Sequence, residues 1–161
     1  MRQAIHQQMQ LGEVDISAIP FNPKSRDDIP RLLRGLQYIW ISLELRNQVF
    51  QALEAMIPAS RHNGRPGMDL WQILVFGTLR LIANCDYDRL QELANEHGTL
   101  RKMLGHGPYC AHSYHIQTLQ DNISLFTSKI LDQVNQIVVA AGHQLVKKKG
   151  SRYMAVPIRL S

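Results

Sequence analysis

The chain has 161 residues, and its hydrophobic fraction of 45% is ordinary for a globular protein and too high for a disordered one. The formal net charge is +5, but five basic residues and no acid lie from Val146 onward, so the rest of the chain is neutral. The longest apolar runs are too short to cross a bilayer, and the N-terminus lacks the apolar stretch of a secretory signal. We therefore expect a cytoplasmic protein without a membrane partner.

The N-terminal residues 1–26 lack helical periodicity, and we expect a flexible arm with a short extended piece at residues 16–21. Helical signals begin at Asp27 and Asp28, which can cap a helix whose first turn accommodates Pro30. Apolar residues at helical spacing continue this helix to Trp40. A second apolar stripe predicts a helix over residues 43–57, which Pro58 stops.

The most apolar stretch of the chain follows a polar loop that ends near Gly67. Asp69 can cap a helix that reaches residue 84, and because apolar residues lie on nearly all its sides, we expect it to be central and buried. Gly77 in its middle suggests close packing against another helix. A short turn at Cys85 and Asp86 leads to the next expected helix.

The remaining helices are expected over residues 87–97, with Gly98 as C-cap, and over residues 99–104, 115–125 and 128–146. The pattern predicts an all-α bundle of five to seven helices. Its organisation would be an arm (1–26), a helical domain (27–145) and a basic tail (146–161).

The helices expected over residues 69–84 and 87–97, with the tight turn between them, suggest a helix-turn-helix. Four polar residues of the second helix could enter the major groove: Arg89, Gln91, Glu92 and Asn95. The alternative is an ordinary pair of adjacent helices, which every all-α domain contains. The acids around Arg89 also disfavour deep insertion beside phosphates.

The loop from Arg61 to Arg65 contains glycine and two arginines, a composition that can bring backbone N–H groups and guanidinium forks to phosphates. The alternative is a solvated linker with incidental charges. No Lys–Ser/Thr pair follows the loop, so it is not a nucleotide-binding P-loop.

A cluster of zinc-ligand residue types lies in the following loop: His106, Cys110, His112 and His115. Its spacing matches no familiar zinc pattern, so we predict no metal site. Cys85 and Cys110 are expected to be free thiols, as in a reducing compartment. The paired acids at 27/28 and 86/88 suggest helix starts, so we predict no catalytic residue.

Several long strings of the chain resemble one family: GRPGMDLWQILVFGTLRLIANCDYDRLQELANEHGTLRKMLGH, SRDDIPRLLRGLQYIW, HIQTLQDNISLF and VVAAGHQLVKKK. They are similar to ISNCY-type bacterial insertion-sequence transposases, over about residues 1–149. The resemblance implies an all-helical, DNA-binding N-terminal module. In the family an RNase H-like domain follows, whose three acids bind two divalent metal ions for strand transfer.

The resemblance stops at Lys147, Lys148 and Lys149, because GSRYMAVPIRLS does not fit the family's catalytic domain. Three lysine codons form an A-rich run on which ribosomes and replication slip. We therefore expect a frameshift at this point, either programmed or through decay of the element. The chain would then be no enzyme and would need no cofactor, Mg²⁺ being expected only for the missing catalytic domain.

The expected function is recognition of transposon ends in double-stranded DNA, in a cytoplasmic, nucleoid-associated protein. The predicted DNA contacts are Arg61, Arg65, Arg89, Arg101 and Lys102, with nonspecific contacts from Lys147, Lys148 and Lys149. One alternative is a module for dimerisation or for interaction with full-length transposase, which the neutral charge of residues 1–145 favours. Another is a nonfunctional product of a decayed element.

Overall fold

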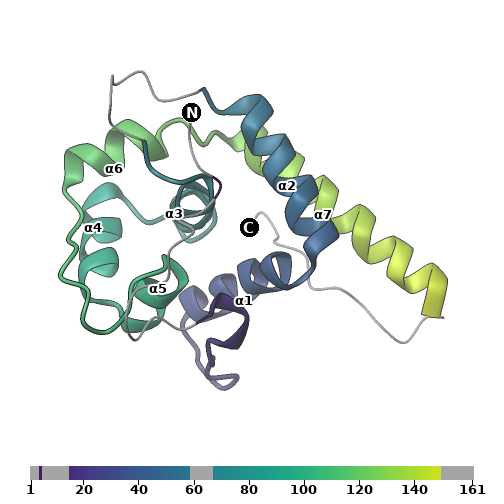
Figure 1. Ribbon diagram of the computed structural model, residues 1–161, viewed down its shortest axis with the longest axis horizontal. Helices are drawn as coiled ribbons and strands as arrows, with labels where there is room; N and C mark the ends of the chain where they lie inside the picture. The colour runs from purple at the N-terminus through teal and green to yellow at the C-terminus, as the bar shows by residue number, and fades with distance from the viewer. Residues whose placement is uncertain (1–3, 5–14, 59–66, 150–161) are drawn as a thin grey trace.

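A computed structural model describes Ala4 and residues 15–58 and 67–149, with only the backbone described for residues 143–149. These ranges contain helices and no strand, which confirms the predicted all-α fold (Figure 1). The elements are η1 (Ile16–Ala18), α1 (Asp28–Ile41), α2 (Leu43–Met56), α3 (Leu70–Ile82), α4 (Tyr87–Glu96), α5 (Gly98–Met103), α6 (Ile116–Ile123) and α7 (Ser128–Lys149).

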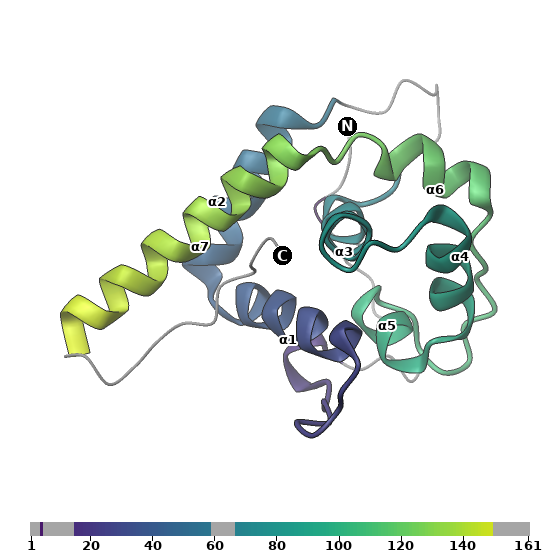
Figure 2. The ribbon, with the colours of Figure 1, turned by 180° about the vertical axis from the view of Figure 1, so that it is seen from behind.

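Helix α3 lies at the centre of the bundle, as its apolar sequence predicts. All of its residues from Leu70 to Leu79 are buried except Gln72, which is partly buried. Figures 1 and 2 show α1, α4, α5 and α6 around it on one side and the α2–α7 pair on the other. A helix with no polar face is stable only where other helices cover every side, so α3 organises the whole core.

Three aromatic rings join the first three helices at one point. Trp40 of α1, Phe50 of α2 and Trp71 of α3 have ring centroids 5.0–6.5 Å apart, in edge-on and tilted arrangements. The indole Nε1 of Trp71 donates a hydrogen bond of 2.7 Å to the carbonyl of Met103. Because this buried donor is satisfied by α5, Trp71 links α3 to a helix thirty-two residues further along the chain.

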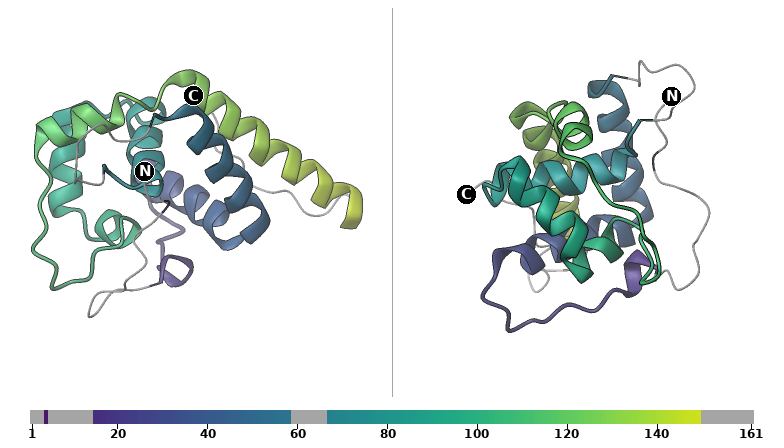
Figure 3. Two further views of the ribbon diagram at one scale, coloured as in Figure 1. Left: turned by 45° about the horizontal axis from the view of Figure 1, so that its top comes forward. Right: turned by 90° about the vertical axis from the view of Figure 1, so that its left-hand side faces the viewer.

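Helix α7 packs along α2, and its far end extends beyond the bundle (Figures 1 and 3). The contact face includes Ile130, Leu131, Val134 and Val138, which are buried. The helix continues to Lys149, three residues beyond its predicted end at residue 146, and the division into arm, helical domain and tail stays a prediction. Among the described residues, no helix is both long and apolar enough to cross a membrane.

Two further local predictions are corrected. The part of the arm from residue 15 onward is packed, because Ile16 and Ile19 are buried and Gln37 of α1 donates 2.9 Å hydrogen bonds to both of their carbonyls. The segment contains a 3-10 turn where an extended piece was expected. Gly98 does not cap α4: it begins α5, since the His97 side chain accepts from the Leu100 N–H as an N-cap.

Candidate nucleic-acid interface

The α3–α4 pair has the short connection that the sequence predicts. Residues 83–86 separate the two helices, and Asn84 takes a left-handed conformation (φ 55°) that turns the chain after α3. Asp86 then caps α4, its carboxylate accepting from the Arg89 N–H at 2.8 Å. The two helices are therefore joined by a short turn, while the helix-turn-helix assignment and its use for reading DNA stay predictions.

The inner polar residues of α4 are engaged inside the protein. Asn95 accepts from the Tyr114 N–H at 2.7 Å and donates back to the Tyr114 carbonyl at 3.3 Å. Gln91 donates to the same carbonyl at 3.1 Å. The suggestion that Gln91 and Asn95 reach base edges is therefore corrected, because both amides hold the loop before α6.

The outer side of α4 is predominantly acidic. Its exposed charged side chains are those of Asp86, Asp88, Glu92 and Glu96, against the single cation Arg89. Arg89 lies 3.6 Å from Glu92 in an exposed ion pair. Arg89 is accessible as predicted, but the surrounding carboxylates repel phosphate groups.

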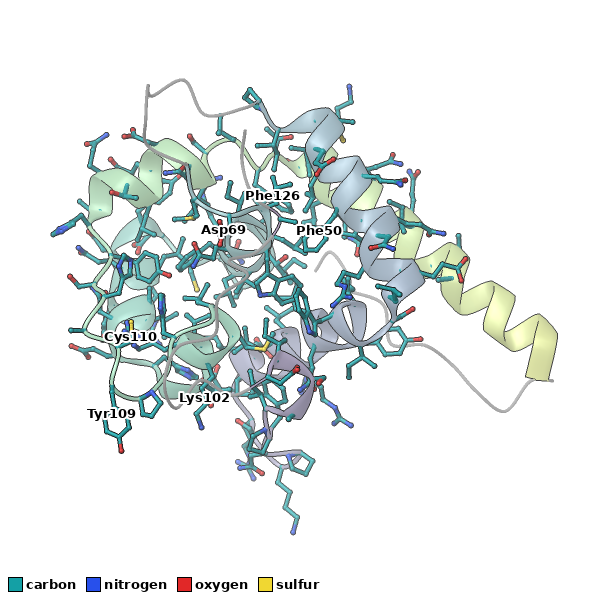
Figure 4. The ribbon with its side chains drawn as sticks, viewed as in Figure 1. Phe50, Asp69, Lys102, Tyr109, Cys110 and Phe126 are labelled. Carbon is teal, nitrogen blue, oxygen red and sulfur yellow. The ribbon has the colours of Figure 1, made fainter. Side chains whose placement is uncertain are left out.

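Arg101 and Lys102, adjacent in α5, have different environments. The Arg101 guanidinium donates to the carbonyls of Ala94, Cys110 and His112 at 2.8, 3.1 and 2.9 Å. This geometry favours a structural role for Arg101, which joins α4 to the loop after α5. Lys102 is half-buried in the last turn of α5 (Figure 4).

The other predicted DNA contacts cannot be placed as side chains. Arg61 and Arg65 lie outside the described residues. Lys147, Lys148 and Lys149 lie in the last turn of α7, where the backbone alone is described. The three lysines thus belong to a helix, where the sequence suggested a flexible basic run.

The predicted histidine–cysteine cluster surrounds Tyr114. His106 Nε2 lies 2.6 Å from the Tyr114 hydroxyl, and the Cys110 Sγ lies 3.6 Å from His106 Nδ1. The rings of His106 and His112 stack with centroids 5.1 Å apart. Ring nitrogens arranged in this way do not converge, and no group of three potential ligands for a metal occurs among the described residues.

Burial controls the ionisation of this cluster. It lowers the pKa of His106 to about 4, with help from the Arg101 charge and from His112. Burial also raises the pKa of Tyr114 above its ordinary value, and it lowers that of His112. The cluster therefore holds a neutral imidazole and a neutral phenol at neutral pH, a state suited to packing and hydrogen bonding.

A basic surface that the sequence analysis did not single out lies around α1. We call it the α1 basic face and define it by four exposed cations of residues 24–34: Lys24, Arg26, Arg31 and Arg34. Arg31 and Arg34 are exposed on the side of α1 opposite its buried stripe. Arg31 and Arg34 are three residues apart, and residues at this spacing share one face of a helix. The sequence therefore contained a usable signal for this pair.

Comparisons of the chain with models of protein families, with curated proteins and with solved structures find no match. The likeness to insertion-sequence transposases therefore depends on the residue strings alone, and it stays a prediction.

Proposed function

We propose that this chain is a non-catalytic, DNA-binding helical module of the kind that precedes the catalytic domain in ISNCY-type transposases, and that it recognises transposon ends. The strings that resemble the family fall on α1, on the stretch from α3 to the loop after α5, on α6 and on the second half of α7. The longest string contains the α3–α4 pair with its short turn. The proposal gives the chain no active site and no cofactor of its own.

The observation that carries the proposal is the internal bonding of this family-like stretch. Trp71 and Gln72 of α3 donate to the carbonyls of Met103 and Leu104 at 2.7 and 3.2 Å. Arg101 joins α5 to α4 through the Ala94 carbonyl. The stretch thus forms one rigid unit, and rigid elements are what a protein needs to present side chains to DNA in a fixed register.

The test is a binding comparison between two duplexes of equal length. One duplex carries the terminal repeat of the element that encodes the chain, and the other carries a shuffled sequence. We expect the terminal repeat to bind about 10-fold or more tightly, the effect of one or two base contacts at about 1–3 kcal/mol each. Equal affinity for both duplexes would refute site recognition.

A second binding comparison uses Arg89, the single cation on the outer side of α4. Arg89→Ala tests whether α4 reads the DNA. A base contact in two places would lower the preference for the terminal repeat by about 1–3 kcal/mol, whereas an unchanged preference would place the reading surface elsewhere. Lys129→Ala, which removes an exposed cation from α7, is the matched control. Metal-dependent nicking of either duplex with Mg²⁺ or Mn²⁺, lost in Asp86→Asn, would contradict the non-catalytic assignment.

A second candidate function is assembly with another transposase chain. Ile41 and Leu43, at the corner between α1 and α2, are 59% and 61% exposed, and Val139 on α7 is 40% exposed. Large apolar side chains at such exposure are typical of interaction surfaces when they are contiguous. Sedimentation of the wild-type chain and of the Ile41→Ser/Leu43→Ser variant tests this candidate: it predicts a wild-type dimer and a variant monomer.

A further inference from the structure

We propose that the outward stripe of α1, with Arg31 and Arg34 at its centre, is the surface that contacts the DNA phosphate backbone, and that α4 faces away from the duplex. This inference rests on the proposed DNA-binding function and names the surface that performs it. It differs from the expectation drawn from the helix-turn-helix pattern, which placed the second helix of the pair against the DNA.

The charge distribution separates the two candidate surfaces. The outer side of α4 carries four carboxylates and one arginine, whereas the α1 basic face carries four cations beside the exposed carboxylates of Asp27 and Asp28. Asp27 is committed to the α1 N-terminus, where its carboxylate accepts from the Ile29 N–H at 3.0 Å. Binding to DNA gains its free energy largely from counterions released when cations meet phosphates, so the cationic surface is favoured.

The two central arginines are free to meet phosphates. Arg31 lies 3.8 Å from Asp28, and both side chains are about three-quarters exposed, so this ion pair is weak and exchangeable. Arg34 forms no ion pair with any of the described residues. This contrasts with Arg101, whose guanidinium already donates to three carbonyls, and with Arg46, which stacks over the Trp40 ring at 4.4 Å.

The shape of the molecule fits an extended polyanion better than a compact acidic partner. Helix α1 has 14 residues and is therefore about 21 Å long, enough to follow several phosphates of one strand.

The experiment measures the salt dependence of binding to a duplex of random sequence, about 30 base pairs long, between about 50 and 200 mM salt. It uses the full chain and two variants. Arg31→Gln/Arg34→Gln removes the central arginines of the α1 basic face. Lys129→Glu lowers the net charge by the same two units at an exposed position on α7, and is the matched control.

We expect the α1 variant to lower the slope of log K against log salt by about 1.8, since each lost phosphate contact contributes about 0.9. At about 0.1 M salt this corresponds to about 50-fold weaker binding. The control should keep the wild-type slope. Both variants should keep the wild-type melting temperature, because all three substituted side chains are exposed.

Two failures can be told apart. If the wild type binds DNA and the control loses as much slope as the α1 variant, the assignment of the surface is wrong while DNA binding stands. If the wild type does not bind at about 50 mM salt, DNA binding itself fails. Salt-sensitive self-association that Arg31→Gln/Arg34→Gln abolishes would then assign the α1 basic face to a second copy of the chain.

Discussion

The ring of Phe126, in the turn before α7, lies directly on the backbone of α3 at Gly77. A Cβ built at Gly77 would come within 2.9 Å of the Phe126 Cβ and closer still to its ring. Gly77 is closely packed, as the sequence suggested, but its neighbour is a turn and not the second helix that was expected. Only a residue without a side chain leaves room for this contact.

We expect Gly77→Ala to destabilise the protein by about 1–3 kcal/mol, because the added methyl overpacks the core and displaces Phe126. Urea denaturation of the wild type and the variant measures this change. Gly98→Ala is the control, since nothing lies within 4 Å of its Cβ position, and its effect should be within about 1 kcal/mol of zero. Alanine has the higher helix propensity, so an unchanged or increased stability of Gly77→Ala would contradict the close contact with Phe126.

The buried imidazole of His106 predicts loss of stability in acid. Its pKa falls from an ordinary 6.5 to about 4 in the folded protein. The unfolded chain thus binds the proton more readily, and stability that is complete above pH 6.5 decreases as the pH falls toward 4. The loss should reach about 3 kcal/mol at pH 4.

The measurement is the free energy of unfolding between pH 7 and pH 4 for the wild type and His106→Gln. The variant keeps a hydrogen-bonding group but does not titrate, so its curve should be flatter than that of the wild type. Acidic side chains also titrate as the pH approaches 4, but they do so in both proteins, so the difference between the two curves reports on His106. Parallel curves would mean that His106 does not control this pH dependence.

The three carbonyls that Arg101 contacts predict a structural effect on substitution. Arg101→Lys should cost about 1–3 kcal/mol of stability, because an ammonium cannot reproduce the fork that reaches Ala94, Cys110 and His112. Hydrogen exchange should increase in residues 105–115. Lys102→Gln, one residue away, should change the stability by less than about 0.5 kcal/mol. A stable Arg101→Lys protein with weakened DNA binding would instead favour a direct DNA contact.

The two thiols should differ in reactivity. Both cysteines are free, as the sequence predicts, but Cys85 is buried and Cys110 is only partly buried. Burial raises the pKa of the Cys85 thiol, and the thiolate is the reactive form. We expect Cys110 to be alkylated about 10-fold or more faster in the native protein, as measured by mass spectrometry of peptides. Equal alkylation rates for the two thiols in the native protein would contradict the buried environment of Cys85.

The sequence by itself determined the helices, because the signals that set them are local. Asp27 and Asp86 cap α1 and α4 as their positions predict, and the apolar run from Leu70 to Leu79 is the centre of the core. Two observed helix boundaries differ from the predicted ones, the start of α5 at Gly98 and the end of α7 beyond Val146. Each lies where the start or end of a helix depends on a single turn.

Only the tertiary structure decided which polar side chains face outward. Arg101, Gln91 and Asn95 resemble surface residues in the sequence, yet they bind carbonyls and an amide of the loop after α5. Backbone groups are the same in every residue, so no sequence pattern marks which of them a distant side chain will meet. Arg31 and Arg34 are exposed because the apolar stripe of α1 packs into the core and leaves the opposite side of the helix in solvent.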